Sequence, residues 1–390
     1  MPDMTPSPNP TEVTERATAV LDAAWDDFRG SSFPHADVYG HQWLWDSCFH
    51  AIAWAALDDD RALRELGSVF SAQLPNGFVP HMRYSEPTQY RGPLAHASSF
   101  TQPPVYGLAA ASIATTGRTV PPPLLAHISH AYDYLWSRRR TADGLLRIVH
   151  PWEAGADDSP RWDGWIGHDR WNRPEWTAFD LEAVAAARFA PSGEAIASDI
   201  FEAAPAAFNA IAAHGMDALA RLSGESVWED RAAALGAAID DHLWFDEEGL
   251  WSDVALVGSG ATVSVPTLDG ALGLLTTHDE GKAQRALAQL ADPDRFCAPY
   301  GLAYVARAHP AYRGDLYWRG AAWPQLNHLA RVAAHRWGAH DLADDIAEMS
   351  RRGAMTSGFS ELWDPETGEA RGAVPQTWAA LAAVPSAMLR

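Results

Sequence analysis

The stretch TEVTERATAVLDAAWDDFR (residues 11–29) shows the pattern that decides the fold of this chain. Its apolar residues recur at intervals of three and four, which is the spacing of one face of an α-helix: Ala17, Leu21, Ala24, Trp25 and Phe28. The same periodicity returns along most of the 390 residues. It predicts helices over residues 11–29, 46–57, 60–73, 101–116, 122–139, 176–190, 196–213, 216–222, 227–243, 267–276, 280–291, 300–308, 319–336, 338–353 and 376–388.

Strand patterns are few and short. Residues 145–150 and 254–257 are the best candidates. A chain that is almost all helical can form a bundle, a solenoid or a closed toroid of helix pairs, and no fixed-period repeat typical of a solenoid is present. Long connections rich in Trp, Gly, Pro and Asp interrupt the helices at 30–45, 74–100, 140–175, 309–318 and 354–375. We therefore expect an all-α toroid whose long loops gather at one end as the active-site cleft.

The chain contains no segment that resembles a linker, so we expect one domain over residues 11–390 after a disordered tail at residues 1–10. A formal net charge of −21 argues against partners such as nucleic acid or an anionic membrane. Two isolated cysteines and unpaired histidine spacings predict no disulfide framework and no metal site. The N-terminus lacks a basic and an apolar segment, which favours a cytoplasmic protein. Self-association is an open alternative.

The loop PWEAGADDSPRWD (residues 151–163) places four acids among tryptophan, glycine and proline. A carboxylate beside indole rings is poorly solvated, so its pKa rises or it requires a partner. This setting suits a general acid that must keep its proton at neutral pH. For any single acid, capping of a turn or helix is the simpler interpretation, but that interpretation is weaker for the four together: Glu153, Asp157, Asp158 and Asp163.

The loop GFSELWDPETGEARGAVPQTW (residues 358–378) contains a second acid in apolar surroundings, Glu361, next to Leu362 and Trp363. The following Asp364-Pro-Glu-Thr-Gly368 predicts a tight turn that would hold Glu361 in place. We assign Asp364 and Glu366 to turn formation and Glu361 to catalysis. Two carboxyls facing one cleft are the minimal apparatus for splitting a glycosidic bond.

Eighteen tryptophans exceed what the core of such a chain requires, and many of them cluster. Helix packing explains about half, while the others can stack on sugar rings and donate their N–H groups. Asp46 and Arg319 are the polar groups we expect nearest to a saccharide. The segment 81–92 is either a solvated lid or a site for a charged aglycone, formed by Arg83, Tyr84, Tyr90 and Arg91.

Five separated blocks in this chain resemble glycoside hydrolase family 63, in the bacterial branch that includes mannosylglycerate and glucosylglycerate hydrolases. The blocks are YGHQWLWDSCFHAIA (39–53), NGFVPHM (76–82), PWEAGADDSPRWD (151–163), YWRGAAWPQLNHL (317–329) and ELWDPETGE with QTWAA (361–380). The resemblance implies an (α/α)6 barrel and inverting hydrolysis of a small α-glycoside, with release of glucose or mannose and with no cofactor. It implies Asp157 as the general acid and Glu361 as the general base.

In the inverting template, the two carboxyls lie about 6.5–9.5 Å apart to admit a water. We expect the following residues, all but Gln102 within these blocks, to bind the substrate: Tyr39, Trp43, Trp45, Asp46, Gln102, Trp152, Glu153, Trp162, Tyr317, Trp318, Arg319, Gly320, Trp323 and Gln376.

Two departures from the family pattern affect the substrate and the acid. The family's Asn after the acid is Asp158 here, which adds a charge, and a Ser of the same block is Ala154. The chain is also shorter than its counterparts, so an α-glucobiose is an alternative substrate to glucosylglycerate or mannosylglycerate. Glu175 is a rival for the acid, since related helical-barrel glucosidases use a Glu.

Two other classes of function are alternatives. A sugar epimerase or isomerase on the same barrel would need paired histidines in the cleft, for which His81, His150 and His328 are available. A catalytically silent sugar-binding protein is disfavoured because both acids are present.

Overall fold

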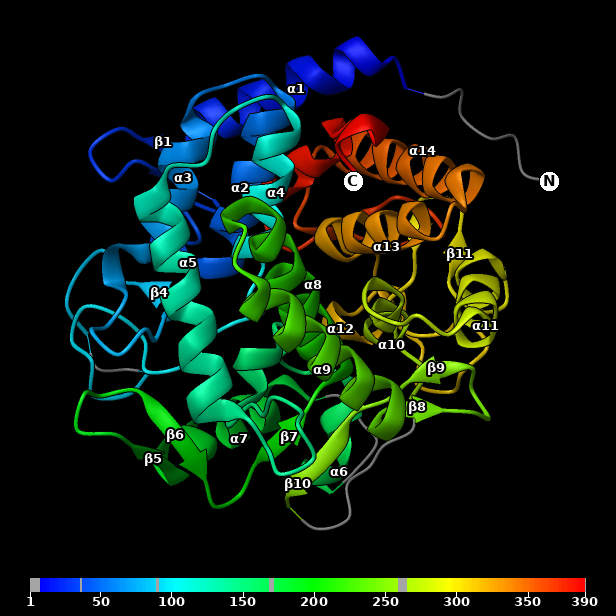
Figure 1. The fold of residues 1–390 in the computed structure, drawn as a ribbon. Coiled ribbons are helices and arrows are strands. Elements are labelled where there is room, and N and C mark those ends of the chain that lie inside the picture. Colours follow the sequence, from blue (N-terminus) through cyan, green and yellow to red (C-terminus); the bar gives the residue numbers. More distant parts are fainter. Residues whose placement is uncertain (1–7, 36, 89–90, 168–171, 259–264, 390) are drawn as a thin grey trace.

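The computed structural model describes residues 8–35, 37–88, 91–167, 172–258 and 265–389. The protein is mostly helical, as predicted (Figure 1). The α-helices are α1 (Pro10–Ala24), α2 (Leu44–Ala56), α3 (Arg61–Val69), α4 (Tyr106–Thr115), α5 (Pro122–Tyr134), α6 (Asp163–Ile166), α7 (Arg173–Ala186), α8 (Ala206–Ser223), α9 (Ser226–His242), α10 (Leu268–Ala271), α11 (Glu280–Ala291), α12 (Tyr317–Gly320), α13 (Pro324–Arg336) and α14 (His340–Ser357).

Short strands pair two by two and form no larger sheet in the described part of the chain. The antiparallel pairs are β1 (Trp25–Asp26) with β2 (Ser31–Ser32), β3 (Gln42–Trp43) with β4 (Met82–Arg83), β5 (Ala187–Phe189) with β6 (Ala195–Ser198), β7 (Glu202–Ala204) with β10 (Val254–Val257), β8 (Trp244–Phe245) with β9 (Leu250–Trp251), β11 (Cys297–Ala298) with β12 (Gly301–Leu302), and β13 (Leu362–Trp363) with β14 (Ala370–Arg371).

The most buried helices contact one another in a closed sequence. Helix α2 packs on α4, α4 on α8, and α8 on the 3₁₀ segment Leu272–Leu275 that continues α10. That segment packs on α13, α13 packs on the 3₁₀ segment Thr377–Ala383, and the latter returns to α2. In α2 every residue except Ala56 is buried, so this helix is apolar nearly all round, as expected of an inner helix.

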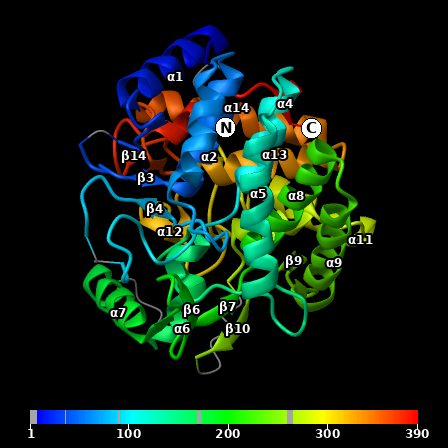
Figure 2. The ribbon, with the colours of Figure 1, turned by 60° about the vertical axis from the view of Figure 1, so that its left-hand side comes forward.

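A second set of helices covers the first. Helices α1, α3, α9 and α14 lie against the 3₁₀ segment 377–383, α2, α8 and α13 respectively, and each keeps an exposed polar face. Figures 1 and 2 show α8 beside α9 and α13 beside α14, with α6, α7, β6, β7 and β10 together at one end. The first described helix and the last part of the chain lie together, because α1 packs on the 3₁₀ segment 377–383.

The sequence-based boundaries match α9 and α11 within one residue and fail where tertiary contacts intervene. Helix α1 ends at Ala24, so Phe28 falls outside it and is 98% exposed instead of joining the apolar face. The predicted helix 300–308 is wrong: it contains β12, and backbone bridges join Ala303 to Ala322 and Val305 to Thr267. The predicted helices 196–213 and 216–222 are instead two short strands followed by the single helix α8.

Both strand predictions can be compared with the structure. Residues 254–257 form β10, as expected. Residues 145–150 form only isolated bridges, through Leu146 to Arg140 and through Ile148 to Ala203.

Candidate active site

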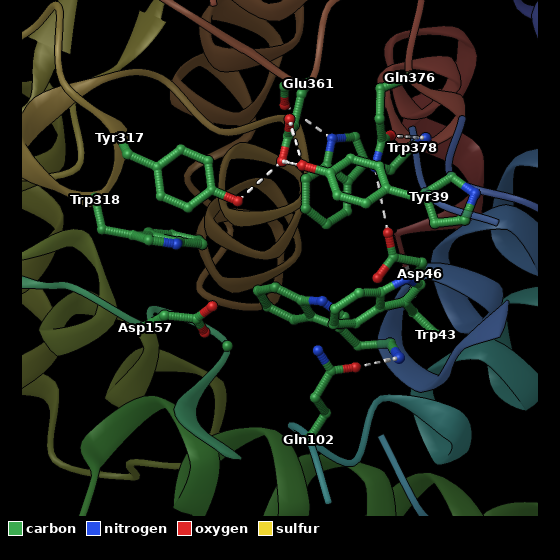
Figure 3. A pocket seen from close by; sticks show the side chains of 13 residues that line it. Tyr39, Trp43, Asp46, Gln102, Asp157, Tyr317, Trp318, Glu361, Gln376 and Trp378 are labelled. Carbon is green, nitrogen blue, oxygen red and sulfur yellow. Dashed lines mark hydrogen bonds between the residues drawn. The ribbon is translucent and has the colours of Figure 1, made fainter. Parts of the chain in front are cut away.

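Residues mainly from the long loops line a pocket of about 400 Å³. Its lining comes from five separate stretches of the chain (Figure 3). All five are predicted from the sequence to be loops or the first residues of helices. The lining residues are Pro34, Tyr39, Trp43, Trp45, Asp46, Gln102, Gly155, Asp157, Tyr317, Trp318, Glu361, Gln376 and Trp378.

Asp157 is presented to this pocket by a tightly held loop. The loop begins with the 3₁₀ turn Pro151–Ala154, whose first free N–H group, on Trp152, is accepted by the His150 side chain. Gly155 follows with φ of 77°, and a Cβ on it would stand 2.7 Å from the indole of Trp45. Only glycine allows both this conformation and this close approach. On the far side, the Trp162 indole donates to the carbonyl of Ala156 at 2.9 Å, which fixes the backbone directly before Asp157.

The Asp157 carboxyl is in surroundings that favour its neutral form. Burial raises its pKa well above the ordinary value, and the negative charges of Asp180 and Asp158 raise it further. The positive charges of Arg91 and Arg173 act in the opposite direction and are smaller. A carboxyl that keeps its proton near neutral pH is what a general acid requires.

Glu361 enters from the opposite side of the pocket and is surrounded by hydrogen-bond donors. Its oxygens accept from the hydroxyl of Tyr39 at 2.9 and 3.0 Å, from the hydroxyl of Tyr317 at 2.9 Å and from the N–H of Ala373 at 2.9 Å. Burial raises the pKa of Glu361 on balance, and these hydrogen bonds oppose the rise. Because every donor stabilises the charged form, the site can hold a buried carboxylate that accepts a proton from water.

Between the two acids the pocket is walled by indole rings and polar amides. Trp318 lies nearly parallel to Trp323, with ring centroids 3.6 Å apart, so its other face is held flat toward the pocket. Asp46 is buried and accepts from the Gln376 amide at 3.2 Å, and burial raises its pKa to about 7. Such an array of flat apolar faces and buried polar groups matches the two faces of a sugar ring.

Ten of the sixteen predicted catalytic and substrate-binding residues line this pocket, and six do not. The six are Trp152, Glu153, Trp162, Arg319, Gly320 and Trp323. Several of them support the wall from behind: Trp323 stacks on Trp318, and the Arg319 guanidinium forms two hydrogen bonds of 2.7 Å with Asp163. Pro34, Gly155 and Trp378 line the pocket although the sequence did not place them there. The sequence contains a signal for Trp378, because this residue lies two positions after Gln376 in the family-like block QTWAA (376–380).

Glu153 forms a buried ion pair instead of reaching a ligand. Its oxygens accept from Arg139 at 2.8 and 2.7 Å and from the backbone N–H groups of Val149 and Thr101, and both side chains are fully buried. We predict that Glu153→Gln lowers the free energy of unfolding by about 3–5 kcal/mol, because it leaves the buried charge of Arg139 uncompensated. Urea denaturation checks this, with the exposed Glu369→Gln as the control; equal stability of both variants would contradict it.

The rival acid and the candidate histidines lie elsewhere. Glu175 is exposed on α7 and is absent from the pocket lining. His81, His150 and His328 are buried, and burial lowers the pKa of His150 and of His328 to about 3 and that of His81 well below its usual value. None of the three lines the pocket, so the paired histidines that an isomerase needs are not found there among the described residues.

The segment expected to bind an aglycone lies beside the mouth of the pocket. The Arg91 guanidinium stands over the rings of Trp43 and Trp152, at 5.2 and 4.6 Å from their centroids. Tyr84 and Arg91 also line a neighbouring hollow of about 660 Å³. Arg83 is half-buried and lines neither, while Tyr90 lies outside the described residues.

Neither a metal-binding cluster nor a membrane-spanning helix is present among the described residues. No group of three or more His, Cys, Asp or Glu side chains in them is arranged to hold a metal ion. No helix among them is long and apolar enough to span a membrane.

The chain is similar to known glycoside hydrolases. The family model described as the mannosylglycerate hydrolase MGH1-like glycoside hydrolase domain matches residues 39–379. A mannosylglycerate hydrolase of Rubrobacter radiotolerans is 29% identical, covering 96% of each chain. A glucosylglycerate hydrolase of Mycolicibacterium hassiacum is 28% identical, covering 97% of this chain and 98% of the relative. The crystal structure of the family 63 mannosylglycerate hydrolase from Thermus thermophilus with Tris and D-glycerate superposes with a TM-score of 0.80 at 25% identity, covering 95% of this chain and 99% of that one.

Proposed function

This chain belongs to the mannosylglycerate hydrolase MGH1-like family of glycoside hydrolases, and from that membership we propose that it hydrolyses an α-glycoside of D-glycerate with inversion. The protein is a glycosidase that releases a sugar from a small glycoside. The observation that carries the proposal is the placement of Asp157 and Glu361 on opposite sides of one aromatic pocket. In the proposed reaction, Asp157 protonates the glycosidic oxygen while Glu361 takes a proton from the attacking water.

The proposed architecture is an (α/α)6 barrel in a single domain over residues 11–390. The closed sequence of contacts among α2, α4, α8, the segment 272–275, α13 and the segment 377–383 supports it as the inner ring. Helices α1, α3, α5, α9, α11 and α14 would then form the outer ring. In such a barrel, the long loops that carry Asp157 and Glu361 would lie at the same end.

Several features support a small, negatively charged aglycone. Arg91 stands over Trp43, one of the lining residues, and a guanidinium can bind a carboxylate through paired hydrogen bonds. The names of the relatives divide between mannosylglycerate and glucosylglycerate hydrolase, so either sugar fits the proposal.

The test is a hydrolysis screen over glucosylglycerate, mannosylglycerate and three neutral glucosides, namely glucosylglycerol, kojibiose and isomaltose. We expect one of the two glycerate glycosides to be cleaved with the highest kcat/KM. The β-anomer of the released sugar should appear first in the NMR spectrum. Preferential cleavage of a neutral disaccharide would show that glycerate is not the preferred leaving group. First appearance of the α-anomer would overturn the inverting mechanism.

Tyr39 provides a prediction about the base. Tyr39→Phe removes a donor to both oxygens of Glu361, so burial acts on the carboxylate with less opposition and the pKa of Glu361 rises. The base must be ionised, so activity falls as the pH drops through this pKa. The acidic limb of the pH–kcat/KM profile should therefore move to higher pH, with a loss of roughly tenfold at its former midpoint, as one lost charge-assisted hydrogen bond implies. Tyr312→Phe, outside the pocket, should leave the limb in place.

Asp180 provides the corresponding prediction about the acid. Its charge is the largest electrostatic contribution that raises the pKa of Asp157, and burial raises the pKa of Asp180 itself to about 7. Above that pH, Asp180→Asn removes a negative charge and should lower the pKa of Asp157. The acid must be protonated, so the alkaline limb of the pH profile should move to lower pH. The matched control is Asp199→Asn, on an exposed residue; an unmoved alkaline limb in Asp180→Asn would contradict the prediction.

A further inference from the structure

A small cavity lies beside the loop that carries Glu361, and Trp363 of that loop lines it. It lies among α13, α14, β13 and the 3₁₀ segment 377–383 and offers room for about one small molecule or ion. Its lining combines apolar and polar side chains: Pro324, His328, Arg331, Ser350, Trp363, Leu381 and Ala382. None of these residues lines the active-site pocket.

Arg331 differs from the other buried arginines of the described chain. Arg139, Arg161, Arg319 and Arg352 each form an ion pair with a carboxylate. Arg331 is only 2% exposed and forms none; one nitrogen donates to the carbonyl of Val384 at 3.2 Å. Its Nε and its second terminal nitrogen are buried without a hydrogen-bond partner.

A second orphaned group lies on the same helix face. His328 is one helical turn before Arg331, is 3% exposed, and has no hydrogen-bond partner on either ring nitrogen. The imidazole must carry an N–H group on at least one nitrogen, so it can donate into the cavity. Burial keeps this ring neutral, because it lowers its pKa to about 3.

An uncompensated charge in such a place is costly. Burial lowers the pKa of Arg331 to about 10, yet the group stays protonated at neutral pH. The charged groups that act on it are Arg351, which repels it, and Asp344, whose carboxylate accepts from the Ser386 hydroxyl at 2.7 Å. Buried charges in proteins are normally paired, and buried donors normally have acceptors.

We propose that this cavity is a structural binding site for one small monovalent anion, such as chloride, held by Arg331 and His328. A monovalent anion matches the single positive charge and accepts from the orphaned N–H groups of both side chains. A divalent anion would bring an excess negative charge next to the apolar side chains of Trp363 and Leu381, which line the cavity. Because Trp363 lies two residues after Glu361, the anion stabilises the part of the fold that carries the base.

The primary test uses bromide in place of chloride. Crystals grown in sodium bromide should show an anomalous peak between Arg331 and His328. Thermal unfolding should show a Tm that rises with the logarithm of chloride or bromide concentration, and that does not rise with sodium gluconate at equal ionic strength. A site without an anomalous peak, or an equal rise in gluconate, would overturn the proposal.

Variants separate this site from general salt effects. Arg331→Gln removes the charge and keeps an amide donor for Val384, and it should lose the halide-dependent rise in Tm. His328→Phe keeps a ring of similar shape without donors and should reduce the rise, which provides a second readout if Arg331→Gln fails to fold. Arg336→Gln, on the same helix but bonded to the carbonyls of Leu274 and Thr277, should retain the full rise. Retention of the full rise in both Arg331→Gln and His328→Phe would overturn the assignment.

Discussion

Glu361→Gln is expected to lower kcat by about 10²–10⁴-fold on every substrate, whatever its leaving group. The amide cannot accept a proton from water, so the nucleophile of the proposed reaction is not activated. The fold should survive, because the amide oxygen can accept from the Ala373 N–H and the amide nitrogen can donate to the two tyrosine hydroxyls that now donate to Glu361.

The measurement is steady-state kinetics on a glycerate glycoside and on the corresponding α-glycosyl fluoride. Glu366→Gln is the matched control, since Glu366 is an exposed acid of the same loop that pairs with Arg307. Activity of Glu361→Gln within about threefold of the control would remove Glu361 from its role, because a general base contributes far more than that.

Asp157→Asn is expected to show a loss that depends on the leaving group. With a glycerate leaving group, kcat should fall by about 10²–10⁴-fold, because the departing alkoxide is no longer protonated. Fluoride leaves without a proton, so hydrolysis of the α-glycosyl fluoride should fall far less. This selective recovery distinguishes an acid from a base.

The same two substrates therefore test both assignments. Equal losses on the glycoside and the fluoride in Asp157→Asn would mean that this residue does not protonate the leaving group. Recovery on the fluoride in Glu361→Gln would exchange the two roles. Neither result depends on which sugar the enzyme prefers.

Helix content and the location of the pocket were predictable because both depend on local patterns. The helices 227–243 and 280–291 were placed within one residue of α9 and α11, since their apolar positions are spaced at helical intervals. The loops that carry Asp157 and Glu361 were predictable as functional because carboxylates beside Trp are poorly solvated, which raises their pKa or requires a partner.

Partners from distant parts of the chain could not be predicted. Glu153 and Asp157 occupy the same acidic loop, and both could have faced a ligand. The structure separates them because Arg139 reaches Glu153 across the core, while Asp157 faces the pocket beside Trp318. Arg319 was expected at the sugar for its sequence neighbours, but it pairs with Asp163, 156 residues away.

Residue order and composition are enough to establish that this chain is helical, that its long loops carry paired acids among aromatic rings, and which family these blocks resemble. These properties follow from the spacing and type of residues, and both can be determined without knowing which distant residues are in contact. Which buried charges are compensated and which are not becomes known only from the folded molecule. Burial and pairing are set by side chains that meet across the fold, as Tyr39 meets Glu361, and as Arg331 meets no carboxylate among the residues described.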